Sequence, residues 1–201
     1  MLIRELFERD PTRPIHPIAS VKQHDPSIVY EELDEYVVTD HIRRDLTDIL
    51  DRFLESRRGA VEDVCCWITG FFGSGKSLFL KILGYVLGNL SLDSEREGRI
   101  EAGRFFLNKH GLESYAPMLF KELKTFPLFI NLLDVDAARE PSMTRIVYAE
   151  LLKASGFSKI PWIAEIERTL HQAGLWVNFL ELVQEKEGKS WERVRELILH
   201  A

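Results

Sequence analysis

The sequence of 201 residues contains only two cysteines, and they are adjacent, at positions 65 and 66. Two neighbouring cysteines do not make the disulfide framework that stabilises small secreted domains, which favours a reducing compartment. No apolar run approaches the roughly 18 residues of a membrane span, and charged residues interrupt the first ten positions, where a signal peptide would be apolar. These absences predict a cytoplasmic chain with no membrane partner.

An excess of positive charge is also absent. The chain has 26 lysines and arginines against 32 acidic residues, a net charge of −6. This balance argues against a protein whose main surface binds nucleic acid, although it leaves a local basic patch possible. The six histidines have no spacing typical of metal ligands. With 45% hydrophobic and 29% charged residues the composition is that of a folded globular protein.

A strand, a glycine-rich turn and a helix are predicted in the middle of the chain. Residues 64–69 are short, apolar and rich in strand-forming types, so we interpret them as a strand buried on both faces, with Cys65 and Cys66 filling the core. Residues 76–87 are apolar nearly all round, which predicts a buried helix. The turn between them spans residues 70–75.

The turn and the start of the helix contain the residues from which a function can be predicted. Residues 70–77 match the pattern G-x-x-x-x-G-K-[ST] at every fixed position. A polyphosphate needs many N–H donors in a small volume, and a tight glycine loop followed by a helix N-terminus supplies them. Lys76 adds a positive charge for the β- and γ-phosphates, and Ser77 offers a hydroxyl to Mg²⁺. The predicted nucleotide-binding residues are Gly70, Phe71, Phe72, Gly73, Ser74, Gly75, Lys76 and Ser77.

The nucleotide is predicted to be ATP, by exclusion. The D-x-x-G and N-K-x-D elements that mark a GTPase do not occur. Hydrolysis further requires an acid on a second strand, near the metal. Residues 128–134 are the second strand candidate and end in Asp134, which is the candidate catalytic acid beside Lys76. Asn131 interrupts the apolar run before Asp134, which favours the alternative that Asp134 is an acid at the solvent end of a core strand.

The predicted fold class is α/β: a partial P-loop NTPase with a parallel sheet flanked by helices, an extended and helical lead-in before it, and an all-helical segment after it. Its parts are a lead-in over residues 1–60, an incomplete nucleotide-binding core over 61–140 and helices over 141–201. Only two strands are expected, where such a sheet has about five. We therefore expect a fragment or a natural truncation, with weak or no hydrolysis by this chain and ATPase activity in a complete protein.

Three stretches together resemble one family. Residues 3–15, 30–39 and 67–83, the last including GFFGSGKS and the helix that follows it, are similar to the P-loop protein of the BREX phage-exclusion systems, the BrxC family, called PglY in related systems. The resemblance covers about residues 1–90. It implies an ATP-dependent component of a cytoplasmic antiphage complex, with other BREX proteins as partners and phage DNA as the ultimate target. Direct DNA contact is left open, and only residues 70–77 are carried over as a site.

Two further functions are compatible with the same motif. The chain could be a nucleotide-binding regulatory or scaffold module that controls assembly without turnover. It could also be a small nucleotide or metabolite kinase, but the sequence shows no acceptor site for the phosphate. Phosphate release by the full-length protein, with a Lys76→Ala control, separates these functions.

Overall fold

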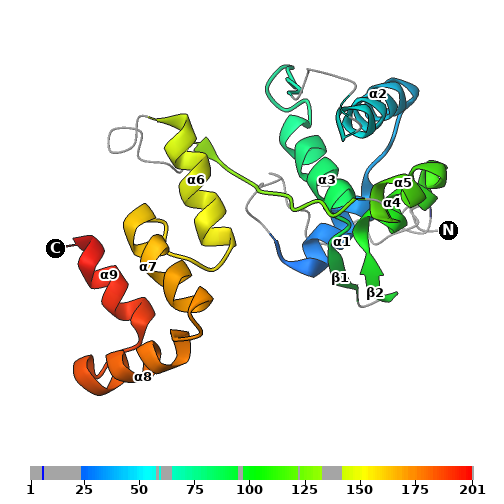
Figure 1. The fold of residues 1–201 in the computed structure, drawn as a ribbon. Helices are drawn as coiled ribbons and strands as arrows, with labels where there is room; N and C mark the ends of the chain where they lie inside the picture. The colour runs from blue at the N-terminus through cyan, green and yellow to red at the C-terminus, as the bar shows by residue number, and fades with distance from the viewer. Residues whose placement is uncertain are drawn as a thin grey trace. The chain divides into compact units, whose positions relative to one another are not determined.

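The computed structural model describes residues 6, 24–57, 59, 65–94, 97–121, 123–132 and 142–200 (Figure 1). The chain divides into two compact units, Met1–Phe129 and Ile130–Ala201. The elements of the first unit are α1 (Pro26–Glu35), α2 (Asp40–Arg57), α3 (Lys76–Gly88), β1 (Ser91–Ser94), β2 (Gly98–Glu101), α4 (Ala102–Lys109), the short 3-10 helix η2 (Glu113–Tyr115) and α5 (Ala116–Lys121). Those of the second unit are α6 (Met143–Ala154), α7 (Pro161–Gln172), α8 (Trp176–Glu187) and α9 (Trp191–His200).

The prediction of an α/β fold with a parallel sheet is wrong. The described residues are mostly helical, and their one sheet has two short antiparallel strands, β1 and β2, with Ser91 paired to Glu101 and Ser94 to Gly98. The two segments predicted as buried strands form no ladder in their described parts, residues 65–69 and 128–132. Cys65 and Cys66, predicted to fill a core, are exposed.

The strand predictions failed for a physical reason. An apolar run shows that a segment prefers to be buried, but it does not show whether another strand lies beside that segment. A strand is defined by hydrogen bonds to a neighbour, and the sequence pattern carries no information on that neighbour. The second apolar run instead covers a helix. A side chain at Gly84 of α3 would overlap the Phe129 ring, and one at Gly88 would overlap Pro127. The apolar residues near position 128 therefore serve helix packing.

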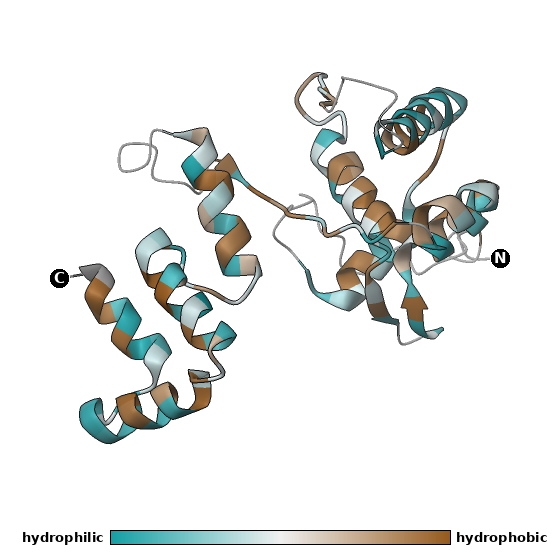
Figure 2. Cartoon of the chain, viewed as in Figure 1, coloured by the Kyte–Doolittle hydropathy of each residue, from teal (hydrophilic) through white to brown (hydrophobic). Residues whose placement is uncertain are grey.

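The core of the first unit is built from the apolar faces of its helices. Hydrophobic and hydrophilic residues alternate along α2 with helical spacing (Figure 2), and its Leu46, Leu50 and Leu54 are buried. The buried helix predicted over residues 76–87 is confirmed as α3, whose Ile82 and Val86 are almost fully enclosed. The other side chains exposed by 1% or less in this core are Val29, Leu33, Ala102, Phe106, Leu107 and Leu119. Each large apolar side chain buried this way stabilises the unit by roughly 1.5–3 kcal/mol.

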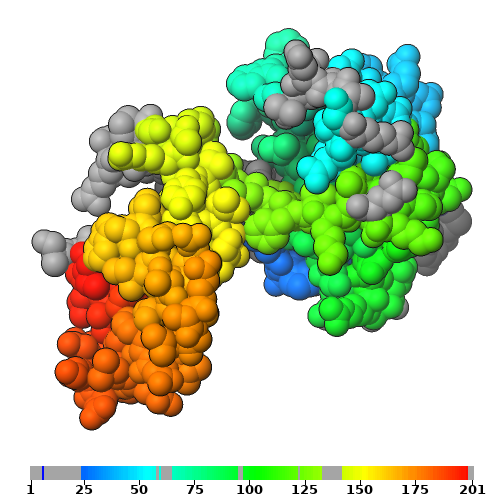
Figure 3. All heavy atoms as spheres, viewed as in Figure 1, coloured from blue at the N-terminus to red at the C-terminus, as the bar shows by residue number. Residues whose placement is uncertain are grey.

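Residues 91–121 contain elements that sequence patterning missed. Residues 91–112 are polar and weakly patterned, which predicted no element, but they include the β1–β2 hairpin and α4; a helix was expected over about 112–123, where η2 and α5 lie. In the space-filling view this green segment forms a continuous surface (Figure 3), and α4 contacts both β2 and α5. Strands of four residues are too short to show a clear alternation, which is why the pattern gave no signal.

An ion pair is buried between α1 and α3. The side chain of Lys81 is 1% exposed, and its Nζ lies 2.6 Å from a carboxylate oxygen of Glu32, whose side chain is 16% exposed. Within the described part of the chain, neither Lys81 Nζ nor this Glu32 oxygen has a hydrogen-bond partner apart from the ion pair itself. Each charge therefore depends on the other for its compensation, and together they join α1 to the helix that follows the glycine-rich turn.

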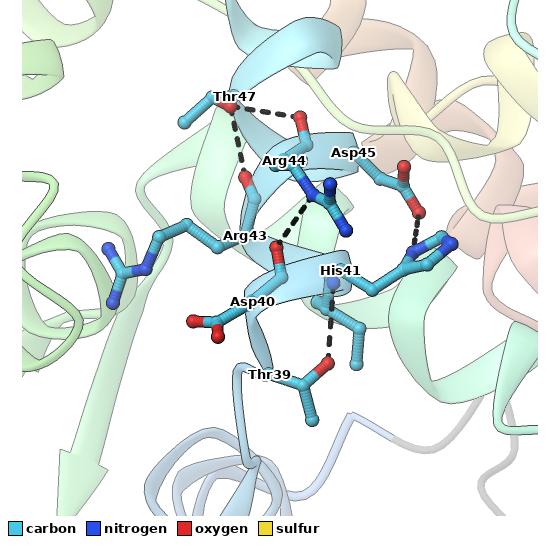
Figure 4. A network of polar contacts seen from close by, with 8 residues as sticks. Thr39, Asp40, His41, Arg43, Arg44, Asp45 and Thr47 are labelled. Atoms are coloured by element: carbon cyan, nitrogen blue, oxygen red, sulfur yellow. Dashed lines mark hydrogen bonds and ion pairs between the residues drawn. The ribbon is translucent and has the colours of Figure 1, made fainter.

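The first turn of α2 is closed by Thr39 and not, as predicted, by Asp40. The Thr39 hydroxyl accepts a hydrogen bond of 3.3 Å from the Ile42 N–H, and Asp40 is the first helical residue (Figure 4). A threonine cap before an acidic residue satisfies both preferences of a helix N-terminus, a side-chain acceptor and a negative charge in the first turn. His41 Nδ1 lies 2.9 Å from Asp45, one turn further along.

The described residues of the second unit form four helices within the helical region predicted over 141–201, and each helix packs against the next. A buried carboxylate joins three of its parts. Glu167 of α7, 1% exposed, accepts hydrogen bonds from the Ser158 N–H at 2.6 Å, from Trp191 Nε1 at 2.6 Å and from Arg195 Nη1 at 3.1 Å. A buried charge with several donors is tolerated because its lone pairs are satisfied.

The stability of the first unit is expected to fall as the pH drops below about 6.5. The His110 ring packs against the Phe106 ring in a tilted arrangement, with ring centroids 4.4 Å apart, and burial, together with the nearby Lys109 and Arg43 charges, lowers the pKa of His110. Because the folded pKa lies below the unfolded value, the unfolded chain takes up a proton first. The histidine's contribution is thus complete above about pH 6.5 and is lost below it, by at most about 1.4 kcal/mol per pH unit.

Urea unfolding between pH 7.5 and 5.5, read from hydrogen exchange of the α4 amides, measures this effect. Burial also lowers the pKa of His24, so the variant His110→Leu should reduce the pH slope without removing it. A slope unchanged in that variant would contradict the assignment to His110.

Candidate functional site

The glycine-rich turn has the tight backbone that the motif requires. Gly73 and Gly75 have φ values of +79° and +82°, in the left-handed region that glycine adopts without steric cost. The Ser74 N–H donates to the Phe71 carbonyl at 3.2 Å, which closes the turn. The first hydrogen bond of α3 follows, from the Phe79 N–H to the Gly75 carbonyl at 2.9 Å. The predicted order of turn and helix is confirmed at this point of the chain.

Lys76 is folded back over this loop. Its Nζ donates hydrogen bonds to the Gly70 carbonyl at 2.9 Å and to the Phe71 carbonyl at 2.6 Å, and it lies 3.4 Å from the Ser74 hydroxyl. The ammonium group thus joins the beginning of the loop to its end. The carbonyl groups that hold the ammonium are dipoles without net charge, so the lysine has no carboxylate partner in these contacts.

The N-terminus of α3 adds a second source of positive potential. Lys76 is the first residue of this 13-residue helix, and the capping position is Gly75, which has no side chain to accept from the first-turn N–H groups. Uncapped N–H groups and the positive end of the helix dipole point toward the loop. The exposed Ser77 occupies the second position of the helix.

A cavity of about 530 Å³ adjoins the loop, within the range of small-molecule sites. The loop and α3 contribute Gly70, Ser74 and Lys76 to its wall, and α2 contributes Ile42 and Asp45 from across the cavity. The residues that line it also include Tyr36, Asp48, Ile49, Cys66, Trp67, Ile68, Thr69, Phe71, Gly75 and Phe79. One end of this cavity is therefore rich in N–H donors, and the rest is largely apolar.

Lys76 is the one lysine or arginine among the described residues that line the cavity, beside two aspartates of α2. Each aspartate has a partner on its own helix: the Arg52 guanidinium lies 3.2 Å from Asp48, and the His41 imidazole lies 2.9 Å from Asp45. These pairs offset the negative charge of the α2 wall. An anion in the cavity is attracted to the loop end, where Lys76 and the helix N-terminus coincide.

Aromatic side chains lie around the entrance. Phe71, which lines the cavity, is 92% exposed, and Trp67 is 85% exposed. Phe72 is fully exposed. The two phenylalanines occupy loop positions where polar residues are more usual, and both rings are exposed, although only Phe71 is among the described residues that line this cavity. A flat nucleobase is one of the few ligands that gains from contact with such rings.

Other predicted features lie outside the described residues. Asp134, the candidate catalytic acid, is among them, as is the proline-rich stretch at 11–18. Across the described ranges, no three histidine, cysteine, aspartate or glutamate side chains come together as a metal site. Of the predicted residues from Gly70 to Ser77, the cavity is lined by Gly70, Phe71, Ser74, Gly75 and Lys76. The wall formed by Tyr36 and α2 was not predicted, because amphipathic helix spacing does not show what the polar face borders.

No protein-family model matches the sequence, and no solved structure is a significant match to the fold. None of the described helices is both long enough and apolar enough to cross a membrane.

Proposed function

We propose that this chain binds Mg-ATP, with the triphosphate held by the loop of residues 70–77 and the base and ribose in the adjoining cavity. The observation that carries the proposal is the position of Lys76 Nζ, fixed over the loop by the carbonyls of Gly70 and Phe71. An ammonium group, a left-handed glycine turn and an uncapped helix N-terminus meet at one end of a cavity of about 530 Å³. Each of these features alone is common, and their coincidence fits a polyphosphate.

In this proposal the residues of the loop have different chemical roles. The N–H groups between Gly73 and Ser77 donate to phosphate oxygens, and Lys76 adds a charge-assisted bond to the β- or γ-phosphate. The Ser77 hydroxyl supplies an oxygen ligand to the Mg²⁺ that ATP brings with it. Magnesium keeps most of its ligands as water and phosphate oxygens, so one hydroxyl from the protein fits its requirements.

Adenine is preferred to guanine because the sequence lacks both GTPase elements. In the wider setting that the BrxC resemblance implies, the chain is the nucleotide-binding part of an antiphage ATPase that works with other BREX proteins. We propose this setting on the resemblance of about residues 1–90.

Isothermal titration of the full chain with Mg-ATP, Mg-GTP and ATP in EDTA tests the proposal. Binding of Mg-ATP with one site per chain is expected, with weaker binding of Mg-GTP and of metal-free ATP. No measurable binding of Mg-ATP, or equal binding of inorganic phosphate, would overturn it.

The rival function, a regulatory module that binds nucleotide without turnover, is separated by phosphate release. An ATPase releases phosphate in proportion to time, and this release should be lost in the Lys76→Ala variant. If the complete protein binds Mg-ATP tightly but releases no phosphate, the regulatory module is the function that fits.

A further inference from the structure

The extended segment before the phosphate loop presents two thiols. Cys65 and Cys66 are both free and exposed. Cys66 lines the cavity of about 530 Å³ together with Gly70, Ser74 and Lys76, and it also lines a second cavity of about 410 Å³ between α2 and α3. Cys65 lines the second of these two cavities. The two thiols therefore differ in their relation to the loop, although they are adjacent in sequence.

The second cavity gives a small molecule room to approach. It is lined by Phe53 of α2 and by Leu83 and Leu87 of α3, with Trp67 shared between the two cavities. An accessible thiol beside open space meets the steric requirement for thiol–disulfide exchange, which needs a line of approach to the attacked disulfide. A buried core cysteine would not meet it.

We propose that Cys66 is a modification site at which a low-molecular-weight disulfide forms a mixed disulfide that competes with nucleotide for the cavity. This inference rests on the proposed function. The Cys66 thiolate attacks one sulfur of the small disulfide, so a new S–S bond forms as the old one breaks. The Cys66 sulfur is oxidised, the small disulfide is reduced to one thiol, and that thiol takes up the proton that Cys66 lost. A reducing thiol reverses the reaction.

Competition follows from the shared cavity. An adduct on Cys66 occupies space beside the residues that hold the phosphates, whereas an adduct on Cys65 lies in the neighbouring cavity. Conversely, bound nucleotide shields Cys66 by mass action. With Mg-ATP at about 100 times its dissociation constant, the rate of Cys66 modification should fall by about 100-fold, because only the free chain reacts.

The experiment uses the full chain with glutathione disulfide as the probe and intact-mass spectrometry as the readout. The variant Cys65→Ser isolates Cys66, and the matched variant Cys66→Ser isolates Cys65. The Cys65→Ser chain should gain one adduct, be protected by Mg-ATP, lose at least about tenfold in Mg-ATP affinity when modified, and recover with dithiothreitol. The Cys66→Ser chain modified at Cys65 should bind Mg-ATP with the same affinity as the unmodified Cys66→Ser chain, and Mg-ATP should not slow the modification of Cys65.

Three results would overturn the proposal: no adduct at Cys66, an adduct rate that Mg-ATP leaves unchanged, or an adduct that leaves Mg-ATP affinity unchanged. Calorimetry on the unmodified chain distinguishes this failure from that of the proposed function. If the unmodified chain binds Mg-ATP and any of these three results is found, the thiol proposal alone is wrong. If it does not bind Mg-ATP, the proposed function and the competition built on it are both wrong.

Discussion

Replacement of Lys76 by alanine should weaken Mg-ATP binding by roughly 10- to 100-fold. A hydrogen bond between charged groups contributes about 1.5–3 kcal/mol, and the Lys76 ammonium is the positive side chain that the structure places over the loop. Isothermal titration of the full-length variant measures the change. The fold should persist, because Lys76 is not part of the buried core.

The matched control for this variant is Lys121→Ala. Lys121 is an exposed lysine in the last turn of α5, so its removal changes the net charge by the same amount. The dissociation constant of the Lys121→Ala variant for Mg-ATP should stay within about twofold of that of the unchanged chain, because an exposed charge away from the ligand is screened by salt. If both variants bind as the unchanged chain does, the loop is not the phosphate site.

The variant Glu32→Leu should destabilise the first unit by about 3–5 kcal/mol, because it leaves the Lys81 ammonium buried without a partner. Removing Lys81 as Lys81→Met should cost less. The carboxylate that stays behind is 16% exposed and can still reach water, whereas the lysine side chain is 1% exposed. Hydrogen exchange of the α3 amides reports the unfolding free energy of this unit separately from the second one.

The double variant Glu32→Leu/Lys81→Met supplies the decisive comparison. Replacing a buried ion pair by apolar groups of similar size is often neutral or stabilising, so the double variant should be more stable than Glu32→Leu alone by several kcal/mol. As a control, Glu101→Leu removes one partner of an exposed pair with Arg104 in the same unit and should change stability by less than about 1 kcal/mol. Additive effects of the two core substitutions would show that the pair is not coupled.

The parts of the molecule that sequence could predict are those fixed by local chemistry. The loop was predicted from its motif because each residue type in it has a local role. Glycine occupies the two left-handed positions, the lysine side chain reaches back over the turn, and the serine lies in the first turn of the helix. The helices of the second unit were found for the same reason, since Pro161 and Ser190 mark starts and Gly156 and Gly174 mark ends.

The parts that failed depend on partners distant in sequence. Residues 65–69 have the composition of a buried strand, but whether a strand pairs with them is a property of the whole fold. Lys81 lies within an apolar helix pattern, and nothing near it in sequence shows that Glu32 neutralises its charge. The cavity wall on α2 was missed because a polar helix face that borders a ligand site has the same spacing as one that borders water.

The most direct test of the account is a crystal structure of the full chain with Mg²⁺ and a non-hydrolysable ATP analogue. The account predicts the triphosphate inside the loop, with N–H groups between Gly73 and Ser77 donating to its oxygens. It also predicts Lys76 Nζ within hydrogen-bond distance of a β- or γ-phosphate oxygen and the Ser77 hydroxyl on the metal. An analogue bound elsewhere on the molecule, with the loop free of phosphate, would contradict it.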